Sequence, residues 1–130
     1  MSKVRNGRHT ETIEGNEFAF WYEDNILHRE DGPAVESSDG YKAWKINGEY
    51  HRVGGPAVVH ANGDKDWYLR GVQHREDGPA FEASNGYREW WINGEELTED
   101  EFNAYLAKKK LNEALQSDLE EKETKGQHKL

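Results

Sequence analysis

The sequence predicts a mainly β protein in which 23-residue β-hairpin repeats form an elongated single antiparallel sheet, with a C-terminal α-helix capping or covering it. Three observations support this class. A His-Arg-x-x-Gly-Pro-Ala segment occurs three times, at His28–Ala34, His51–Ala57 and His74–Ala80, each 23 residues after the last. Asn-Gly or Asp-Gly pairs and tryptophans recur at the same period. A fixed period of this length is typical of arrays in which neighbouring units bury each other's apolar faces.

The array covers about three and a half units within a domain spanning residues 1–97. Stepping back 23 residues from Trp44 reaches Trp21, so residues 16–27 are interpreted as half a unit. Stepping forward from His74 reaches Leu97, where the pattern ends. The complete units are residues 28–50, 51–73 and 74–96.

Within the first complete unit we expect strands at residues 34–36, 41–46 and 49–52. Asn47-Gly48 tolerates the positive φ angles that tight hairpin turns require. Proline has no N–H to donate to a ladder, so each Gly-Pro step is expected to link two hairpins. The prolines of these links are Pro33, Pro56 and Pro79.

Tryptophan and an aliphatic residue stand two positions apart in each unit, as Trp44 and Ile46 do, so both side chains point to one face of the strand. These pairs are expected to form the core, with a tryptophan spine along the sheet. The spine residues are Trp21, Trp44, Trp67 and Trp90.

The C-terminal segment is expected to form a helix over residues 98–121. Thr98 and Glu101 have the spacing of a capping box. Leu111, Leu115 and Leu119 continue an apolar stripe with approximate helical spacing. Two readings remain open: the helix caps the last repeat, or the leucines protrude as a partner or dimer helix. Residues 122–130 are polar and aperiodic, which predicts a disordered tail.

Composition limits the possible partners. The chain has 17 basic and 26 acidic residues and a net charge of −9. Binding to duplex nucleic acid or anionic lipid depends on Lys and Arg, so the charge favours a protein partner with a basic surface and opposes nucleic acid and membrane. The chain has no cysteine and no long apolar run, which is typical of a cytoplasmic protein.

The repeated His-Arg pair is expected to be structural. The histidines stand one unit apart, and two strands at about 4.8 Å separate equivalent residues by roughly 10 Å, too far to share one metal ion. The arginines are expected to lie over a tryptophan of the adjoining unit or to bond the following Asp-Gly turn. These residues are His28, Arg29, His51, Arg52, His74 and Arg75.

Catalysis is not expected, because a repeat presents the same groups at regular intervals whereas enzymes bring dissimilar groups to one point. No cofactor and no metal is predicted. The middle unit departs from its neighbours, with Val53-Gly54 in place of Glu30-Asp31 and Val59-His60 in place of Glu36-Ser37. This asymmetry has two interpretations, a contact surface or drift in a tolerant repeat.

The period, with Trp, then Gly, then a His near the hairpin exit, resembles the MORN (membrane occupation and recognition nexus) repeat over about Asn16 to Leu97. MORN units usually place His-Gly-x-Gly where this chain has His28–Ala34, so it is more similar to MORN-variant repeats of bacterial and phage proteins, some of them antitoxin-like. The resemblance implies stacked β-hairpins and a scaffold or interaction surface. For a phage protein the location is the host cytoplasm.

These observations predict a non-enzymatic protein-binding module, acting as an inhibitor or antitoxin-like protein on a basic target. The expected binding residues are the exposed sheet residues Tyr41, Tyr68, Arg88 and Trp91, together with Leu111, Leu115 and Leu119. One alternative is a nucleotide binder or sponge that stacks ligands between aromatic rungs. Another is homotypic assembly through open sheet ends and the leucine-bearing helix.

Overall fold

The computed structural model describes the backbone of residues 3–127 and side chains through residue 124, and it divides into a β unit, Met1–Leu97, and a helical unit, Thr98–Leu130. The predicted class, mainly β with one C-terminal helix, is confirmed. The helix is α1 (Glu99–Gln127). The strands are β1 (Gly7–Ile13), β2 (Asn16–Glu23), β3 (Ile26–Leu27), β4 (Val35–Ser37), β5 (Lys42–Ala43), β6 (Lys45–Ile46), β7 (Glu49–Tyr50), β8 (Val58–Val59), β9 (Lys65–Asp66), β10 (Tyr68–Leu69), β11 (Val72–Gln73), β12 (Phe81–Glu82), β13 (Arg88–Ile92) and β14 (Glu95–Leu97).

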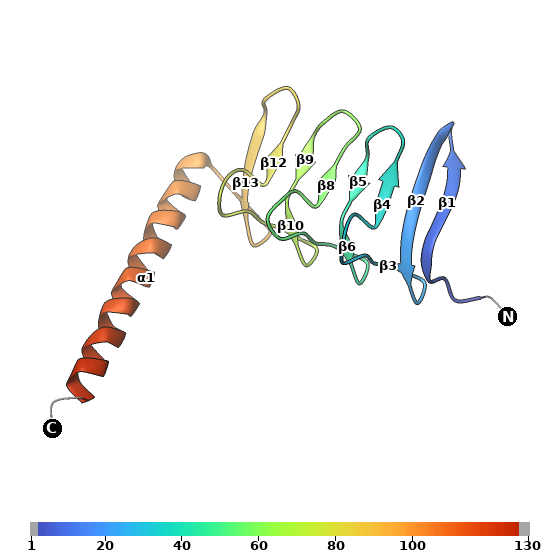
Figure 1. Ribbon diagram of the computed structural model, residues 1–130. Helices are drawn as coiled ribbons and strands as arrows, with labels where there is room; N and C mark the ends of the chain where they lie inside the picture. The colour runs from blue at the N-terminus through green and yellow to red at the C-terminus, as the bar shows by residue number, and fades with distance from the viewer. Residues whose placement is uncertain (1–2, 128–130) are drawn as a thin grey trace. The chain divides into compact units, whose positions relative to one another are not determined.

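The strands of the β unit form one large antiparallel sheet and two short ladders. The large sheet has the order β1-β2-β4-β5-β8-β9-β12-β13-β14, with β3 also paired to β2. The ladders are β6–β7 and β10–β11. Figure 1 shows the hairpins of the β unit standing side by side in chain order. The predicted hairpin array is therefore present. In the first two complete units, however, one pair of strands belongs to the large sheet (β4–β5 and β8–β9) and the other forms a separate two-stranded ladder (β6–β7 and β10–β11).

The tryptophan of each repeat is the residue at which the chain changes its pairing partner. The Trp44 N–H donates to the Ala57 carbonyl at 2.7 Å, and the Trp44 carbonyl accepts from the His51 N–H at 3.0 Å. Before Trp44, β5 pairs with β4 of the same unit on one side and with β8 of the next unit on the other, whereas after Trp44, β6 pairs with β7. The strand predicted at residues 41–46 is consequently interrupted at Trp44.

The turns follow the Asn-Gly and Asp-Gly signals. Asn47 and Gly48 have φ angles of 50° and 80°, as a type I′ hairpin requires. At the other end of the hairpin, Gly40 takes a φ of 101° and donates its N–H to the Ser37 carbonyl. Strand β1 was not predicted, since it lies outside the repeat pattern.

The fully buried residues of the β unit are small. Ala34, Ala57 and Ala80, the last residues of the three repeated segments, are 0% exposed, and Val35 and Val58 beside them are buried. The predicted tryptophan core is wrong in this respect, because the tryptophans are only half-buried. One face of three of these rings is covered by an arginine, and a single-layer sheet leaves their remaining surface near solvent.

Helix α1 begins with the predicted capping box. The Glu101 N–H donates to Thr98 Oγ1 at 3.1 Å, and the Thr98 N–H donates to Glu101 Oε1 at 2.9 Å. These hydrogen bonds hold the pKa of Glu101 below its ordinary value. The helix continues to Gln127, past the predicted end at residue 121, since the segment holds no proline and Lys122 pairs with Asp118 one turn earlier. The predicted tail is therefore helical at residues 122–127, and residues 128–130 lie outside the described part of the chain.

Candidate functional site

The strand register divides the side chains of the large sheet between two faces. Residues directly opposite one another share a face, and side chains alternate along a strand. One row of partners runs across the sheet through Phe20, Val35, Ala43, Val58, Asp66, Phe81 and Glu89. We call this side the aromatic face, because its aromatic residues are Phe18, Phe20, Tyr22, Tyr41, Tyr50, Tyr68, Phe81, Tyr87 and Trp91. The opposite side, which carries Trp21, Trp44 and Trp67, is the tryptophan face.

The rings of the aromatic face contact one another from unit to unit. The ring centroids of Tyr50 and Tyr68 lie 5.3 Å apart, and those of Tyr41 and His60 lie 6.1 Å apart. These rings are half-buried, and Tyr87 is 56% exposed. The face thus carries partly exposed aromatic side chains in every unit, with ring contacts between the first and second complete units.

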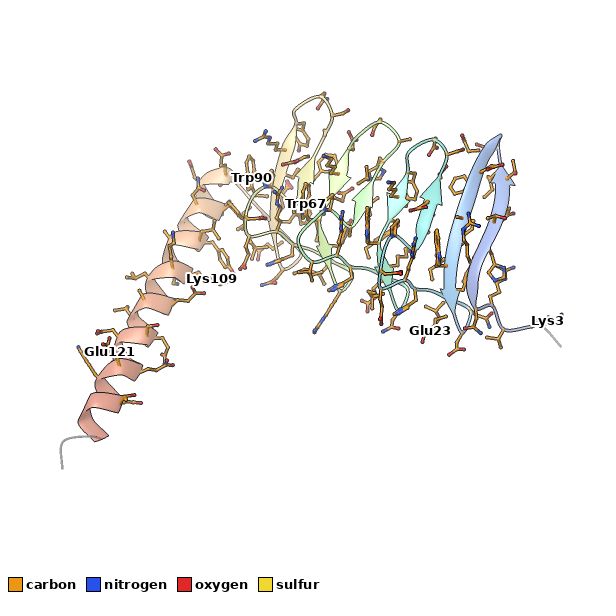
Figure 2. The ribbon with its side chains drawn as sticks, viewed as in Figure 1. Lys3, Glu23, Trp67, Trp90, Lys109 and Glu121 are labelled. Carbon is orange, nitrogen blue, oxygen red and sulfur yellow. The ribbon has the colours of Figure 1, made fainter. Side chains whose placement is uncertain are left out.

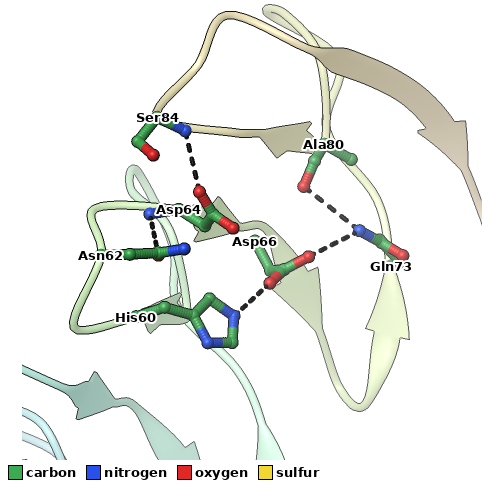
Figure 3. Close-up of polar contacts among 7 residues, drawn as sticks. All are labelled: His60, Asn62, Asp64, Asp66, Gln73, Ala80 and Ser84. Carbon is green, nitrogen blue, oxygen red and sulfur yellow. Dashed lines mark hydrogen bonds and ion pairs between the residues drawn. The ribbon is translucent and has the colours of Figure 1, made fainter.

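A carboxylate occupies the middle of this face. The Asp66 side chain is only 15% exposed, and its Oδ2 lies 2.8 Å from His60 Nε2. Its Oδ1 accepts from Gln73 Nε2 at 3.1 Å, and the same Gln73 amide reaches the Ala80 carbonyl at 3.3 Å (Figure 3). The network joins two consecutive repeats. At the positions equivalent to Asp66 the other units have Ala43 and Glu89, and the Glu89 carboxylate accepts from Tyr87 and Trp91.

The tyrosines around Asp66 are held in their neutral form. Burial raises the pKa of Tyr41 to about 12, with further contributions from Tyr50 and from the charge of Asp66. Burial, then Asp66 and Tyr50, also raise the pKa of Tyr68. At neutral pH the cluster presents protonated phenols beside one carboxylate, an arrangement that favours a cation over an anion.

A second carboxylate links the upper turns of two units. Asp64 Oδ1 accepts the Ser84 N–H at 2.8 Å, and the Asp64 N–H donates to Asn62 Oδ1 at 3.0 Å (Figure 3). The hydrogen bond from Ser84 is the main reason that the pKa of Asp64 is lowered. This contact explains how the middle and third hairpins are aligned.

On the tryptophan face, each repeated arginine stacks on the tryptophan of the preceding unit, as predicted. The guanidinium carbons of Arg29, Arg52 and Arg75 lie 3.9, 3.8 and 3.9 Å from the ring centroids. Each Nη1 donates to the proline carbonyl four residues later, at 3.0 to 3.1 Å. Figure 2 labels Trp67, on which Arg75 stacks, and Trp90 in β13.

The glycine and histidine of the repeated segment complete this structure. A Cβ placed on Gly32 would lie 2.8 Å from Arg29 Cζ, so the guanidinium fits between the tryptophan ring and a glycine. His28 Nδ1 accepts the N–H of Asn47 in the next turn at 2.9 Å, which leaves the ring proton on Nε2. In these contacts the His and Arg side chains link neighbouring segments of the repeat.

The predicted binding residues do not form one group. Tyr41, Tyr68 and Trp91 lie on the aromatic face, where the Trp91 Nε1–H donates to Glu89 at 2.9 Å. Arg88 lies on the opposite face, because it stands between Tyr87 and Glu89 and pairs with Glu82. Its place in the predicted group is therefore wrong. Sequence reasoning missed Asp66 and Tyr50, although Asp66 stands out as a departure from the repeat at its position.

The apolar residues of α1 have two environments. Phe102 is 4% exposed, whereas Leu111, Leu115 and Leu119 are between 53% and 58% exposed. The three leucines lie one turn apart on one side of the helix. Both readings of this stripe, a helix that caps the last repeat and a partner or dimer helix, stay predictions.

Within residues 3–127, no three His, Asp or Glu side chains are grouped so that they would hold a metal ion. The described part of the chain also has no helix whose length and apolar content would let it cross a membrane. The sequence matches no protein-family model, and a search of curated proteins finds no similar chain.

Proposed function

We propose that this chain is a non-enzymatic protein-binding module and that its aromatic face is the binding surface. The observation that carries the proposal is the row of half-buried aromatic side chains across the sheet, with the Asp66 carboxylate at its middle. Tyrosine and tryptophan are enriched at protein interfaces and supply rigid contact area at low entropic cost.

The chemistry of this face favours a partner with a basic surface. Lys45 already places its Nζ 4.4 Å from the Tyr50 ring centroid, which illustrates how a cation binds among these phenols. Asp66 adds negative charge close to Tyr41 and Tyr68. The net charge of −9 would attract a basic surface over longer range. We further propose a divergent MORN-like repeat with an inhibitory or antitoxin-like role, in which this surface covers a basic region of its target.

The leucine stripe of α1 is proposed as a second binding element. Exposed leucines at successive turns are the pattern by which a helix enters an apolar groove of a partner. This element is tested separately from the aromatic face.

The test is affinity capture from the native host lysate with identification by mass spectrometry. The double variant Tyr68→Ala/Tyr87→Ala removes two rings of the aromatic face. Lys65→Ala/Arg88→Ala is the matched control, because both side chains are exposed on the opposite face. We expect the wild type and the control to retain a stoichiometric partner and the tyrosine variant to lose it.

A truncation after Leu97 assigns the role of the helix: loss of the same partner makes α1 necessary. A partner retained equally by the tyrosine variant would contradict the proposed surface. A partner that stays bound at high salt would contradict the electrostatic part of the proposal. Absence of any partner, with saturable quenching of tryptophan fluorescence by nucleotides, would replace it with the ligand-binding alternative.

A further inference from the structure

The three stacked arginines differ in how their charge is neutralised. Arg29 Nε donates to Asp31 at 3.1 Å, and Arg29 Nη1 lies 3.9 Å from Glu36. Arg75 repeats both contacts more closely, with Asp77 at 2.8 Å and Glu82 at 3.1 Å. In the first and third units each guanidinium thus has two carboxylates, one from the loop and one from the following strand.

Arg52, in the middle unit, has neither carboxylate. Gly54 stands at the position of Asp31 and Asp77, and Val59 stands at the position of Glu36 and Glu82. Among the described residues, the acceptor found for the Arg52 side chain is the Pro56 carbonyl, at 3.1 Å from Nη1. The stack on Trp44, at 3.8 Å, is nevertheless as close as in the other units. The guanidinium is therefore positioned in the same way and lacks its usual anions.

The surroundings of Arg52 combine apolar and charged groups. Arg52 lines a groove of about 620 Å³ whose wall includes Trp44, Ile46 and Val53, and also Glu30 and Asp31 of the preceding unit. Val53 replaces the glutamate of the other units and is 81% exposed, the highest value among the exposed large apolar residues. A second groove, of about 340 Å³, is lined by Arg52 and Val53 together with Glu76 and Asp77 of the following unit. The exposed Val53 side chain beside the Arg52 guanidinium therefore offers an apolar contact next to a positive charge.

We propose that Arg52 is a binding site for the carboxylate of an acidic side chain on a partner protein, with an adjoining apolar side chain of that partner in the groove against Trp44 and Ile46. The ligand class follows from the chain itself, because the two equivalent guanidiniums both take carboxylates. The incoming carboxylate would take one of the two places that separate carboxylates occupy in the neighbouring units: at Nε, as Asp31 and Asp77 do, or at the remaining Nη1 proton, as Glu82 does.

This site is separate from the aromatic face. Arg52 stacks on the tryptophan face, and the two faces recognise opposite charges: Asp66 favours a cation and Arg52 an anion. The inference goes beyond the proposed function and does not depend on it, since its test needs no natural partner.

The experiment records ¹⁵N–¹H spectra of the arginine Nε–Hε groups in the full-length chain during titration with the capped dipeptide acetyl-Leu-Asp-amide. Acetyl-Leu-Asn-amide, which has the same shape without the charge, is the control ligand. We expect the Arg52 Nε–Hε and Val53 methyl signals to shift saturably with the Asp peptide alone. The Arg29 and Arg75 signals should not move, because their carboxylates are already in place.

The matched variants are Val59→Glu and Val59→Gln. Glutamate at this position reproduces Glu36 and Glu82, so its carboxylate should pair with Arg52 and lower the affinity for the Asp peptide at least tenfold. Val59→Gln should change this affinity less than threefold. Both variants should keep the fold, because the neighbouring units carry Glu at this position and Gln has nearly the same shape. The proposal is overturned if Arg52 shows no saturable shift, if the three arginines respond alike, if both Val59 variants bind equally, or if inorganic phosphate shifts Arg52 and the Asp peptide does not.

Discussion

The middle repeat, residues 51–73, and its two neighbours share one structural frame and differ at a few positions that lie together. All three place histidine, arginine, glycine, proline and alanine in the same contacts. The middle unit differs at Val53, Gly54 and Val59 around Arg52, and at His60 and Asp66 on the aromatic face. In this chain, the residues that repeat hold the hairpins in register, whereas the departures create one unneutralised cation and one half-buried anion on opposite faces.

The largest expected effect comes from breaking the shared frame. Trp67→Ala should lower the free energy of unfolding by about 3 kcal/mol, because it removes a half-buried ring and uncovers the Arg75 guanidinium that lies 3.9 Å above it. Chemical denaturation monitored by far-UV circular dichroism would measure the loss. Tyr87→Ala, which removes an exposed ring, is the control and should cost much less. Equal losses would show that the tryptophan ladder is not a principal source of stability.

A smaller loss of stability, on substituting the repeated histidines, tests whether their contacts are equivalent in every unit. His28, His51 and His74 each accept one backbone N–H at 2.9 Å from the next turn. His51→Ala and His74→Ala should therefore each cost about 1 kcal/mol, the net value of one such hydrogen bond, and should agree within about 0.5 kcal/mol. His28→Ala should cost somewhat more, because His28 Nε2 also lies 3.3 Å from Glu23 and 3.4 Å from Glu30. A much larger cost at His51 than at His74 would mean that the middle histidine has a role that its neighbours lack.

The parts of the fold that recur with the 23-residue period were predictable from the sequence. The hairpins, their turns and the stack of Arg on Trp follow from local residue types at a fixed period. Burial was not predictable in this way. Ala34 and Ala57 are buried where their backbone hydrogen-bonds to chain segments on both sides, and a strand pattern within one unit does not describe these neighbours. The site was predicted only in part: Tyr41, Tyr68 and Trp91 share a face, but Arg88 was placed by exposure rather than by register, and the pairing of Asp66 with His60 depends on adjacent strands.

The contribution of the aromatic face to stability should fall at alkaline pH. Burial raises the pKa of Tyr41 to about 12 in the folded state, above its ordinary value of 10.0. The unfolded chain therefore loses this proton first, so the contribution of Tyr41 is fully present below pH 10 and is lost as pH rises toward 12. Unfolding measured between pH 9 and 12 should show a shallower decline for Tyr41→Phe than for the wild type. A Tyr41→Phe variant with an unchanged decline would indicate that another group controls it.

The smallest expected change in stability comes from a substitution that makes the middle unit more like its neighbours. Val59→Glu places a carboxylate where Glu82 meets Arg75 at 3.1 Å, and it should be more stable than Val59→Gln by about 0.5 kcal/mol at low salt. The reverse exchange, Glu82→Gln, should lose a similar amount, because it leaves Arg75 with the loop carboxylate of Asp77 alone. Both differences should shrink at 1 M salt, since these groups are partly exposed. A loss at Glu82 without a gain at Val59 would mean that Arg52 is already neutralised by another group, and the comparison between the middle unit and its neighbours would then lose its electrostatic basis.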